Sequence, residues 1–171
     1  MKQTKIISII LHYICYSIAA IYLVSFVFST FSLLTEYGIE PYKDNQRLHL
    51  NYPFTNEALF NIENNLPYII FSFLLPLLVY GIFFLLAARL FKVFFQPKLF
   101  TLKNVSELKR FYLFNIFVPL PIVIFSSFFV VIESFIWALV FIHFILGIFS
   151  LFFANIFKRG LQLQDEQDLY I

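Results

Sequence analysis

Long runs of apolar residues dominate this chain, and short charged segments separate them. Four of these runs reach the roughly 20 residues that a helix needs to cross the hydrocarbon core of a bilayer. None alternates between polar and apolar positions, as a strand of a membrane barrel does, so each run predicts a helix. The sequence therefore predicts an all-α integral membrane protein, one membrane domain over residues 1–171, with transmembrane helices within Ile6–Leu34, Leu66–Ala88, Phe111–Val131 and Phe135–Phe157.

The last two runs form one stretch of 47 residues, Phe111 to Phe157, with a single formal charge at Glu133. As one helix this stretch would be about 70 Å long, roughly twice the thickness of a bilayer core. It must therefore fold back on itself. We expect a hairpin that turns near Glu133 and brings the basic pairs at its two ends to the same side of the membrane.

The basic residues are distributed very unevenly over the two sides of this four-span arrangement. The side that holds both termini also holds residues 89–110 and 158–171, whereas the other side holds residues 36–65, with Lys43 and Arg47 among five acids. Since lysine and arginine are enriched in cytoplasmic segments, both termini are expected in the cytoplasm. Ten of the twelve basic residues lie on that side: Lys2, Lys5, Arg89, Lys92, Lys98, Lys103, Lys109, Arg110, Lys158 and Arg159.

The composition supports a membrane protein and excludes an ordinary soluble domain. Hydrophobic residues make up 61% and charged residues 13% of the chain, against about 45–50% and about 25% in soluble domains. The apolar run after Lys5 is too long for the core of a secretory signal, and no cleavage site ends it, so we interpret it as a retained first helix. The single cysteine, Cys15, excludes an intramolecular disulfide.

The two larger connections differ in character. In the outer loop, residues 36–65, Leu48, Leu50 and Tyr52 alternate with polar residues before Pro53, which predicts a short strand in a small hairpin or cap on the outer membrane face. The inner loop, residues 89–110, is strongly basic and favours contact with anionic lipid headgroups rather than with nucleic acid. Ser106 is the expected N-cap of the third helix.

Ionisable residues are rare inside the predicted spans, and His143 is the one that lies at depth in the last hairpin. Gly147, Ser150 and Ala154 continue its helix face. Small residues on one face allow helices to approach closely, so we expect His143 to form a hydrogen bond across a helix interface rather than to carry protons. The first span has a similar stripe, expected to face the bundle, of Ser8, His12, Cys15, Ala19, Tyr22, Ser25 and Ser29.

The sequence contains no recognisable catalytic or cofactor-binding pattern. No zinc-protease motif, nucleophile elbow, phosphate-binding glycine loop or buried acidic pair occurs in it. The spacing of His12 and Cys15 is compatible with a shared metal ion, but two ligands do not make a metal site. We therefore expect no enzyme activity, no metal and no cofactor.

Two segments on the predicted cytoplasmic side carry a family resemblance. The first runs from Phe100 to Arg110 and contains Phe100-Thr101 followed by Asn104-Val105; the second runs from Ile156 to Ile171. Together they resemble the bacterial domain-of-unknown-function 2975 family of small four-span membrane proteins, although Tyr170 stands where the family usually has threonine. The resemblance implies a location in the bacterial cytoplasmic membrane and no established biochemical activity.

Family members are often encoded beside a small helix-turn-helix regulator, so the resemblance also implies a DNA-binding protein as a partner. Gly160 is expected to cap the fourth helix. The acidic tail after it either folds back onto Lys103, Lys109 or Arg110, or docks to a basic partner. The residues predicted to bind a partner are Phe100, Asn104, Gly160, Asp165, Glu166, Asp168, Leu169 and Ile171.

The sequence thus predicts a membrane protein with a regulatory or scaffolding role, exercised through its cytoplasmic loop and tail. Its expected partners are the lipid bilayer and a helix-turn-helix regulator, without direct contact to nucleic acid, and a homo-oligomer is compatible with the pattern. The alternative is a small transporter or channel component whose pathway is lined by Ser8, His12, Cys15, Tyr22 and His143.

Overall fold

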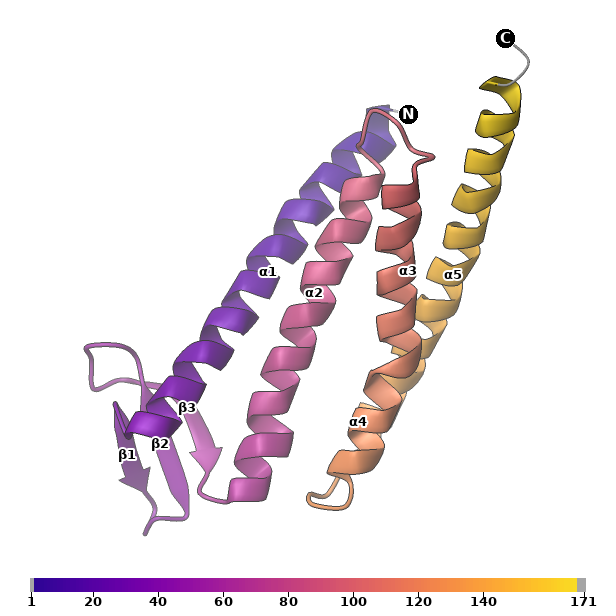
Figure 1. Ribbon diagram of the computed structural model, residues 1–171. Coiled ribbons are helices and arrows are strands. Elements are labelled where there is room, and N and C mark those ends of the chain that lie inside the picture. The colour runs from indigo at the N-terminus through magenta and orange to yellow at the C-terminus, as the bar shows by residue number, and fades with distance from the viewer. Residues whose placement is uncertain (1, 169–171) are drawn as a thin grey trace.

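The computed structural model describes residues 2–168, which form a layer of long helices with a small sheet at one end (Figure 1). In chain order the elements are α1 (Lys2–Thr35), β1 (Ile39–Tyr42), β2 (Arg47–Asn51), β3 (Ala58–Glu63), the π-helix η1 (Tyr68–Leu74), α2 (Leu75–Val93), α3 (Leu102–Phe117), α4 (Pro119–Ser126) and α5 (Ser134–Asp168).

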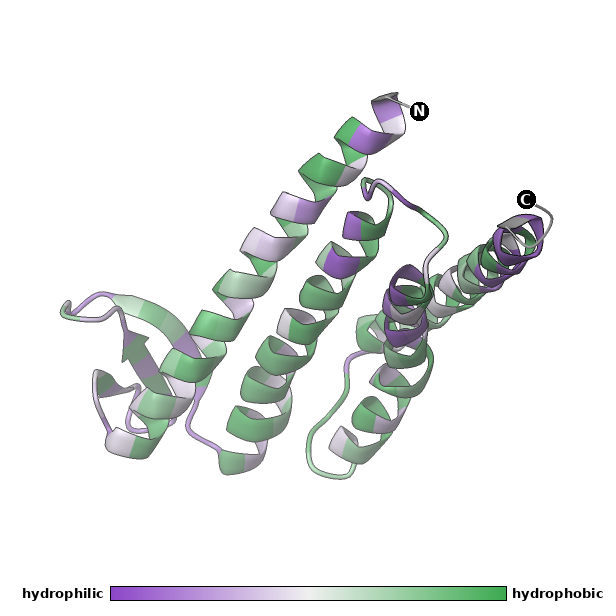
Figure 2. Cartoon of the chain, turned by 45° about the horizontal axis from the view of Figure 1, so that its top comes forward, coloured by the Kyte–Doolittle hydropathy of each residue, from purple (hydrophilic) through white to green (hydrophobic). Residues whose placement is uncertain are grey.

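Within residues 2–168, four helices are long and apolar enough to cross a membrane: Gln3–Thr35, Tyr68–Val93, Leu102–Ser126 and Ser134–Gln167. The four predicted spans are therefore confirmed as helices. Apolar residues cover most of each helix, and hydrophilic residues gather at the N-terminal end of α1, around the connection from α2 to α3 and at the C-terminal end of α5 (Figure 2).

The helices lie side by side and connect at two opposite ends (Figure 1). We call the end that holds the α2–α3 loop, residues 94–101, the tail end, and the end that holds the three strands the sheet end. α2 lies between α1 and α3 and packs against both. The rings of Tyr80 and Phe83 on α2 also reach His143 on α5.

Two predicted helix ends are wrong. α3 begins at Leu102 and its N-cap is Thr101, not Ser106, because the Thr101 hydroxyl accepts a hydrogen bond from the backbone N–H of Asn104. Gly160 does not end α5, which continues as a helix to Asp168. The residues after Gly160 are mostly leucine, glutamine and glutamate, which favour helix, so the α5 helix continues beyond the apolar run.

Prolines interrupt the second and third spans. At Pro119 the third span divides into α3 and α4, because proline has no N–H for the helix ladder. Before Pro76 the second span starts as the π-helix η1, in which the N–H of Leu75 reaches the carbonyl of Ile70, five residues back. Glu133 lies in the turn between α4 and α5, which confirms the predicted hairpin.

The predicted strand around Leu48 and Leu50 is confirmed as β2, but it is the central strand of a three-stranded antiparallel sheet in the order β1-β2-β3. The predicted hairpin implied a partner strand, but the positions of β1 and β3 and the third strand were not predicted. β1 has only four residues, including Pro41, and β3 follows a turn-rich segment. Both are stabilised by pairing with β2, and the local sequence of a strand does not show which strand it pairs with.

Candidate functional site

A group of polar side chains lies midway along the four candidate spans, and each span contributes one of them. Tyr22 comes from α1, Tyr80 from α2, Asn115 from α3 and His143 from α5. Asn115 and His143 are buried, with 1% and 6% of their surface exposed. A buried polar group needs a hydrogen-bond partner among its neighbours, so these residues constrain how the helices pack.

The centre of this mid-span cluster is a hydrogen bond between His143 and Asn115. Nδ1 of His143 lies 2.7 Å from Oδ1 of Asn115, and the Asn115 amide Nδ2 donates to the carbonyl of Phe111 at 2.8 Å. Because Oδ1 can only accept, the hydrogen of this bond belongs to Nδ1. In the neutral imidazole Nε2 therefore keeps a free lone pair.

Aromatic rings extend the cluster from α5 across α2 to α1. The ring of Phe83 meets the His143 ring edge to face at 4.8 Å, and the Tyr80 ring lies 5.9 Å from it. Tyr80 in turn lies 6.1 Å from Tyr22. These contacts join one polar residue of each span into a continuous row of side chains.

The small residues predicted to share the face of His143 do face α3. The Ser150 hydroxyl donates to the carbonyl of Leu108 at 3.4 Å, and Ala154 is buried. A Cβ added to Gly147 would lie 2.5 Å from Cγ1 of Ile116, so only glycine allows this approach of α5 to α3. The prediction that His143 bonds across a helix interface is confirmed.

The stripe of α1 also faces the interior. Ser8, Cys15, Ala19 and Ser29 are buried, and Nδ1 of His12 donates to the carbonyl of Ala88 on α2 at 2.8 Å. Among the described residues, no three His, Cys, Asp or Glu side chains are grouped so that they could hold a metal ion.

Two members of the mid-span cluster were missed by the sequence analysis. Asn115 carries the one side-chain amide of the predicted span 111–131, and this was the available signal. No such signal marks Tyr80, because tyrosine also occurs throughout the apolar runs. Chemically, the cluster offers an imidazole lone pair and two phenol hydroxyls in an apolar setting, which can accept and donate hydrogen bonds.

Three of the residues predicted to bind a partner lie together at the tail end, and their contacts are internal. The ring of Phe100 lies against Gly160, where an added Cβ would come within 2.6 Å of ring atom Cε1. Phe100 also meets the ring of Phe157 edge to face at 5.4 Å. Glycine at position 160 thus allows the α2–α3 loop to pack on α5.

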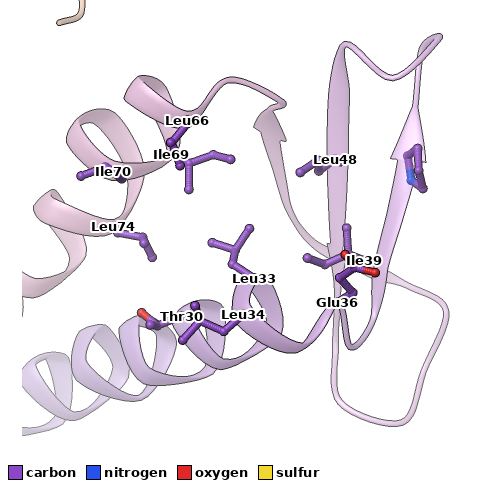
Figure 3. A pocket seen from close by; sticks show the side chains of 11 residues that line it. Thr30, Leu33, Leu34, Glu36, Ile39, Leu48, Leu66, Ile69, Ile70 and Leu74 are labelled. Atoms are coloured by element: carbon purple, nitrogen blue, oxygen red, sulfur yellow. The ribbon is translucent and has the colours of Figure 1, made fainter.

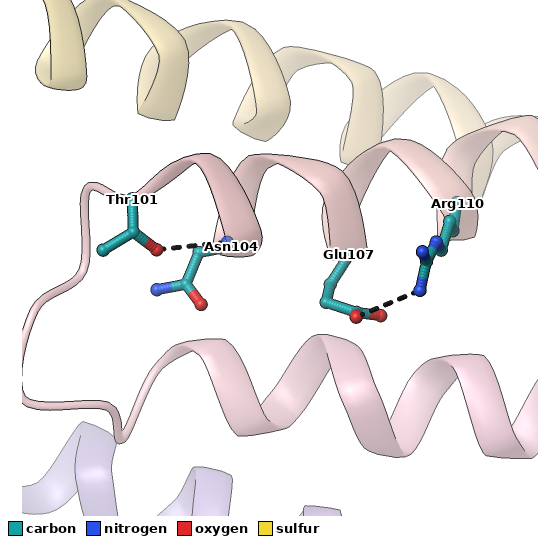
Figure 4. A network of polar contacts seen from close by, with 4 residues as sticks. All are labelled: Thr101, Asn104, Glu107 and Arg110. Atoms are coloured by element: carbon teal, nitrogen blue, oxygen red, sulfur yellow. Dashed lines mark hydrogen bonds and ion pairs between the residues drawn. The ribbon is translucent and has the colours of Figure 1, made fainter.

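Asn104 fixes the shape of the same loop. Its side-chain amide donates to the carbonyls of Lys98 and Leu99, at 3.1 and 2.8 Å. Figure 4 shows Asn104 and Glu107 on the side of α3 that is turned to α2, with α5 on the opposite side. Phe100, Asn104 and Gly160 therefore form a structural joint, which we call the loop–α5 joint.

The remaining predicted partner-binding residues lie beyond this joint. Asp165 and Glu166 are exposed on α5, and Asp168 is the last residue of that helix. Leu169 and Ile171 lie outside the described residues. Arg110 pairs with Glu107 of its own helix at 3.3 Å (Figure 4). Among the described side chains, neither Asp165 nor Glu166 makes an ion pair with Lys103, Lys109 or Arg110.

We predict that the Asn115–His143 bond is measurable as a coupling free energy. Asn115→Ala, His143→Ala and the double variant are unfolded from detergent micelles by titration with a denaturing detergent. The coupling should be about 0.6–1.7 kcal/mol, between the average and the largest value measured for side-chain hydrogen bonds between membrane helices. Ser150→Ala, which removes a longer bond between α5 and α3, serves as the control. The prediction is contradicted if the losses of unfolding free energy in Asn115→Ala and His143→Ala are strictly additive in the double variant.

No family model matches this chain, and no curated protein or solved structure matches it either. Its function is therefore inferred from its own residues and their arrangement.

Proposed function

We propose that this chain is a multi-pass protein of the bacterial cytoplasmic membrane that binds a soluble partner at its cytoplasmic face and has a regulatory or scaffolding role. The observation that supports this role is the continuation of α5 as a helix past the loop–α5 joint to Asp168 (Figure 1). The eight residues 161–168 are about 12 Å long as a helix. A preformed helix binds without the entropic cost of ordering a tail.

The surface of this projecting segment, residues 161–168, suits a basic partner. Asp165 and Glu166 are exposed, and Leu163 beside them has 61% of its surface exposed. Acidic groups steer a basic protein toward the helix, and an exposed leucine supplies an apolar contact once it has docked. DNA-binding proteins carry such basic surfaces.

The resemblance of Phe100–Arg110 and of the tail to the domain-of-unknown-function 2975 family supports the choice of partner. We infer that the partner is a small helix-turn-helix regulator, held at the membrane by this chain. The exposed basic residues of the tail end, Arg89, Lys92, Lys98, Lys103, Lys109 and Arg110, would then lie against anionic lipid headgroups and not against the regulator.

Removal of residues 161–171, which leaves Gly160 and the loop–α5 joint in place, should abolish co-purification of the helix-turn-helix regulator from mild detergent. The double variant Asp165→Lys with Glu166→Lys should weaken it about tenfold, which corresponds to about 1.4 kcal/mol. Gln162→Lys is the matched control, because it adds a positive charge to the same exposed segment without removing an acid. Mass spectrometry of the co-purified proteins measures the effect. Equal recovery with the full chain and the truncated chain would contradict the docking proposal.

The proposed orientation, with both termini in the cytoplasm, is tested by reporter fusions. Fusions after Lys98 and after Arg159 should report a cytoplasmic location, because basic residues cluster around both positions. Fusions at Asn45 and at Glu133 should report the opposite side. A cytoplasmic signal at Glu133 would contradict the proposed orientation.

A second candidate function, a small transporter or channel component, is favoured by the mid-span cluster. Ionisable residues at membrane depth often mark transport pathways, and His143 has a free lone pair on Nε2. In liposomes, the docking role predicts no proton or solute flux above that of empty vesicles. A flux that His143→Ala abolishes and Phe141→Ala leaves intact would replace the docking role by transport, since Phe141 is an exposed residue of the same helix.

A further inference from the structure

A cavity of about 720 Å³ opens at the sheet end, between the last turns of α1, the π-helix η1 and the sheet (Figure 3). Its volume lies within the range of about 300–1,000 Å³ that is typical of ligand sites. The lining is mainly aliphatic, with Leu33 and Leu34 from α1, Leu48 from β2, and Ile69, Ile70 and Leu74 from η1.

The sheet has an apolar face that closes this cavity on one side. Side chains alternate along a strand, so the register pairs Pro41 with Leu48 and Leu48 with Ile62 on one face, whereas Glu40 and His49 pair on the other. Of these residues Pro41 and Leu48 line the cavity. The apolar face of the sheet is therefore directed toward the helices.

The sheet is held over the helix ends by specific contacts. The chain reverses after α1 through Glu36 and Gly38, both with positive φ (59° and 66°), and the N–H of Asn51 donates to the carbonyl of Gly38 at 2.9 Å. The ring of Phe60 on β3 meets Phe73 of η1 edge to face at 5.1 Å. These contacts hold α1, η1 and the sheet in place around the cavity.

The surroundings of the cavity favour a lipid chain as its occupant. Leu34 and Leu66, which both line it, have 80% and 68% of their surface exposed, so the apolar lining continues onto the outside of α1 and of the segment just before η1. Filling such a space with water would leave this apolar surface hydrated, at about 25 cal/mol for each Å². An acyl chain that enters sideways from the bilayer removes that cost.

The charges at the mouth favour a headgroup that carries an amine. Of the described residues that line the cavity, Glu36 alone is charged. The segment 36–65 carries five acids (Glu36, Glu40, Asp44, Glu57 and Glu63) against Lys43 and Arg47. Excess negative charge repels an anionic headgroup and attracts an ammonium group.

We propose that this cavity binds one acyl chain of an amine-bearing phospholipid, such as phosphatidylethanolamine, with the ammonium group beside Glu36. The inference requires the membrane location but is independent of partner docking at residues 161–168. The bound lipid would fix the sheet to the ends of α1 and η1.

The test is native mass spectrometry of the full chain, delipidated in detergent and then incubated with phosphatidylethanolamine or phosphatidylglycerol. The unaltered chain should retain one phosphatidylethanolamine, with at least tenfold preference over phosphatidylglycerol. Leu48→Trp and, separately, Ile70→Trp each place an indole ring at the lining, which fills part of the cavity and obstructs an acyl chain, and each should lower retention at least tenfold. Glu36→Gln should retain the lipid but lose the headgroup preference.

Val27→Trp is the matched control, because it adds the same side chain to an exposed position of α1 outside the cavity and should retain the lipid. Circular dichroism identifies any variant that does not fold. The two filling variants, Leu48→Trp on β2 and Ile70→Trp on η1, are judged separately, so that one can test the cavity if the other does not fold. Retention by both folded filling variants, retention by none of the proteins, or equal binding of the two phospholipids would each overturn the proposal.

Discussion

Polar side chains midway along apolar helices need partners on neighbouring helices, and this constraint determines much of the packing of this chain. The hydrogen bond between His143 and Asn115 joins α5 to α3, and the bond from His12 to the Ala88 carbonyl joins α1 to α2. Gly147 allows the approach of α5 to α3 that the first of these bonds requires. Since apolar helices gain little from contact with one another in lipid, such bonds and close contacts select one arrangement among many.

The number and identity of the long helices could be predicted, because crossing a bilayer requires a length of apolar residues that is visible in any sequence. The interface role of His143 was also predictable, since Gly147, Ser150 and Ala154 follow it on one helix face. Its partner Asn115 was not, because the pairing of two helices depends on long-range packing that no local pattern records. The same reason explains why β1 and β3 were missed.

The helix ends were the least predictable feature. Once a helix leaves the apolar layer, hydrophobic length no longer sets its boundary, and caps and helix propensity decide instead. Thr101 therefore starts α3 earlier than Ser106 would, and the residues after Gly160 continue α5. Of the candidate site, Phe100, Asn104 and Gly160 lie together, and their described contacts are those of a structural joint. Their binding of a partner stays a prediction.

The continuity of α5 has a mechanical consequence. From His143 to Asp168 the helix has no break, and 25 residues correspond to about 37 Å. The contact of Phe100 with Gly160 lies between these two residues. Because α5 is one unbroken helix, a force on residues 161–168 acts first on the contact of Phe100 with Gly160 and then on the interface of α5 with α3 that contains His143.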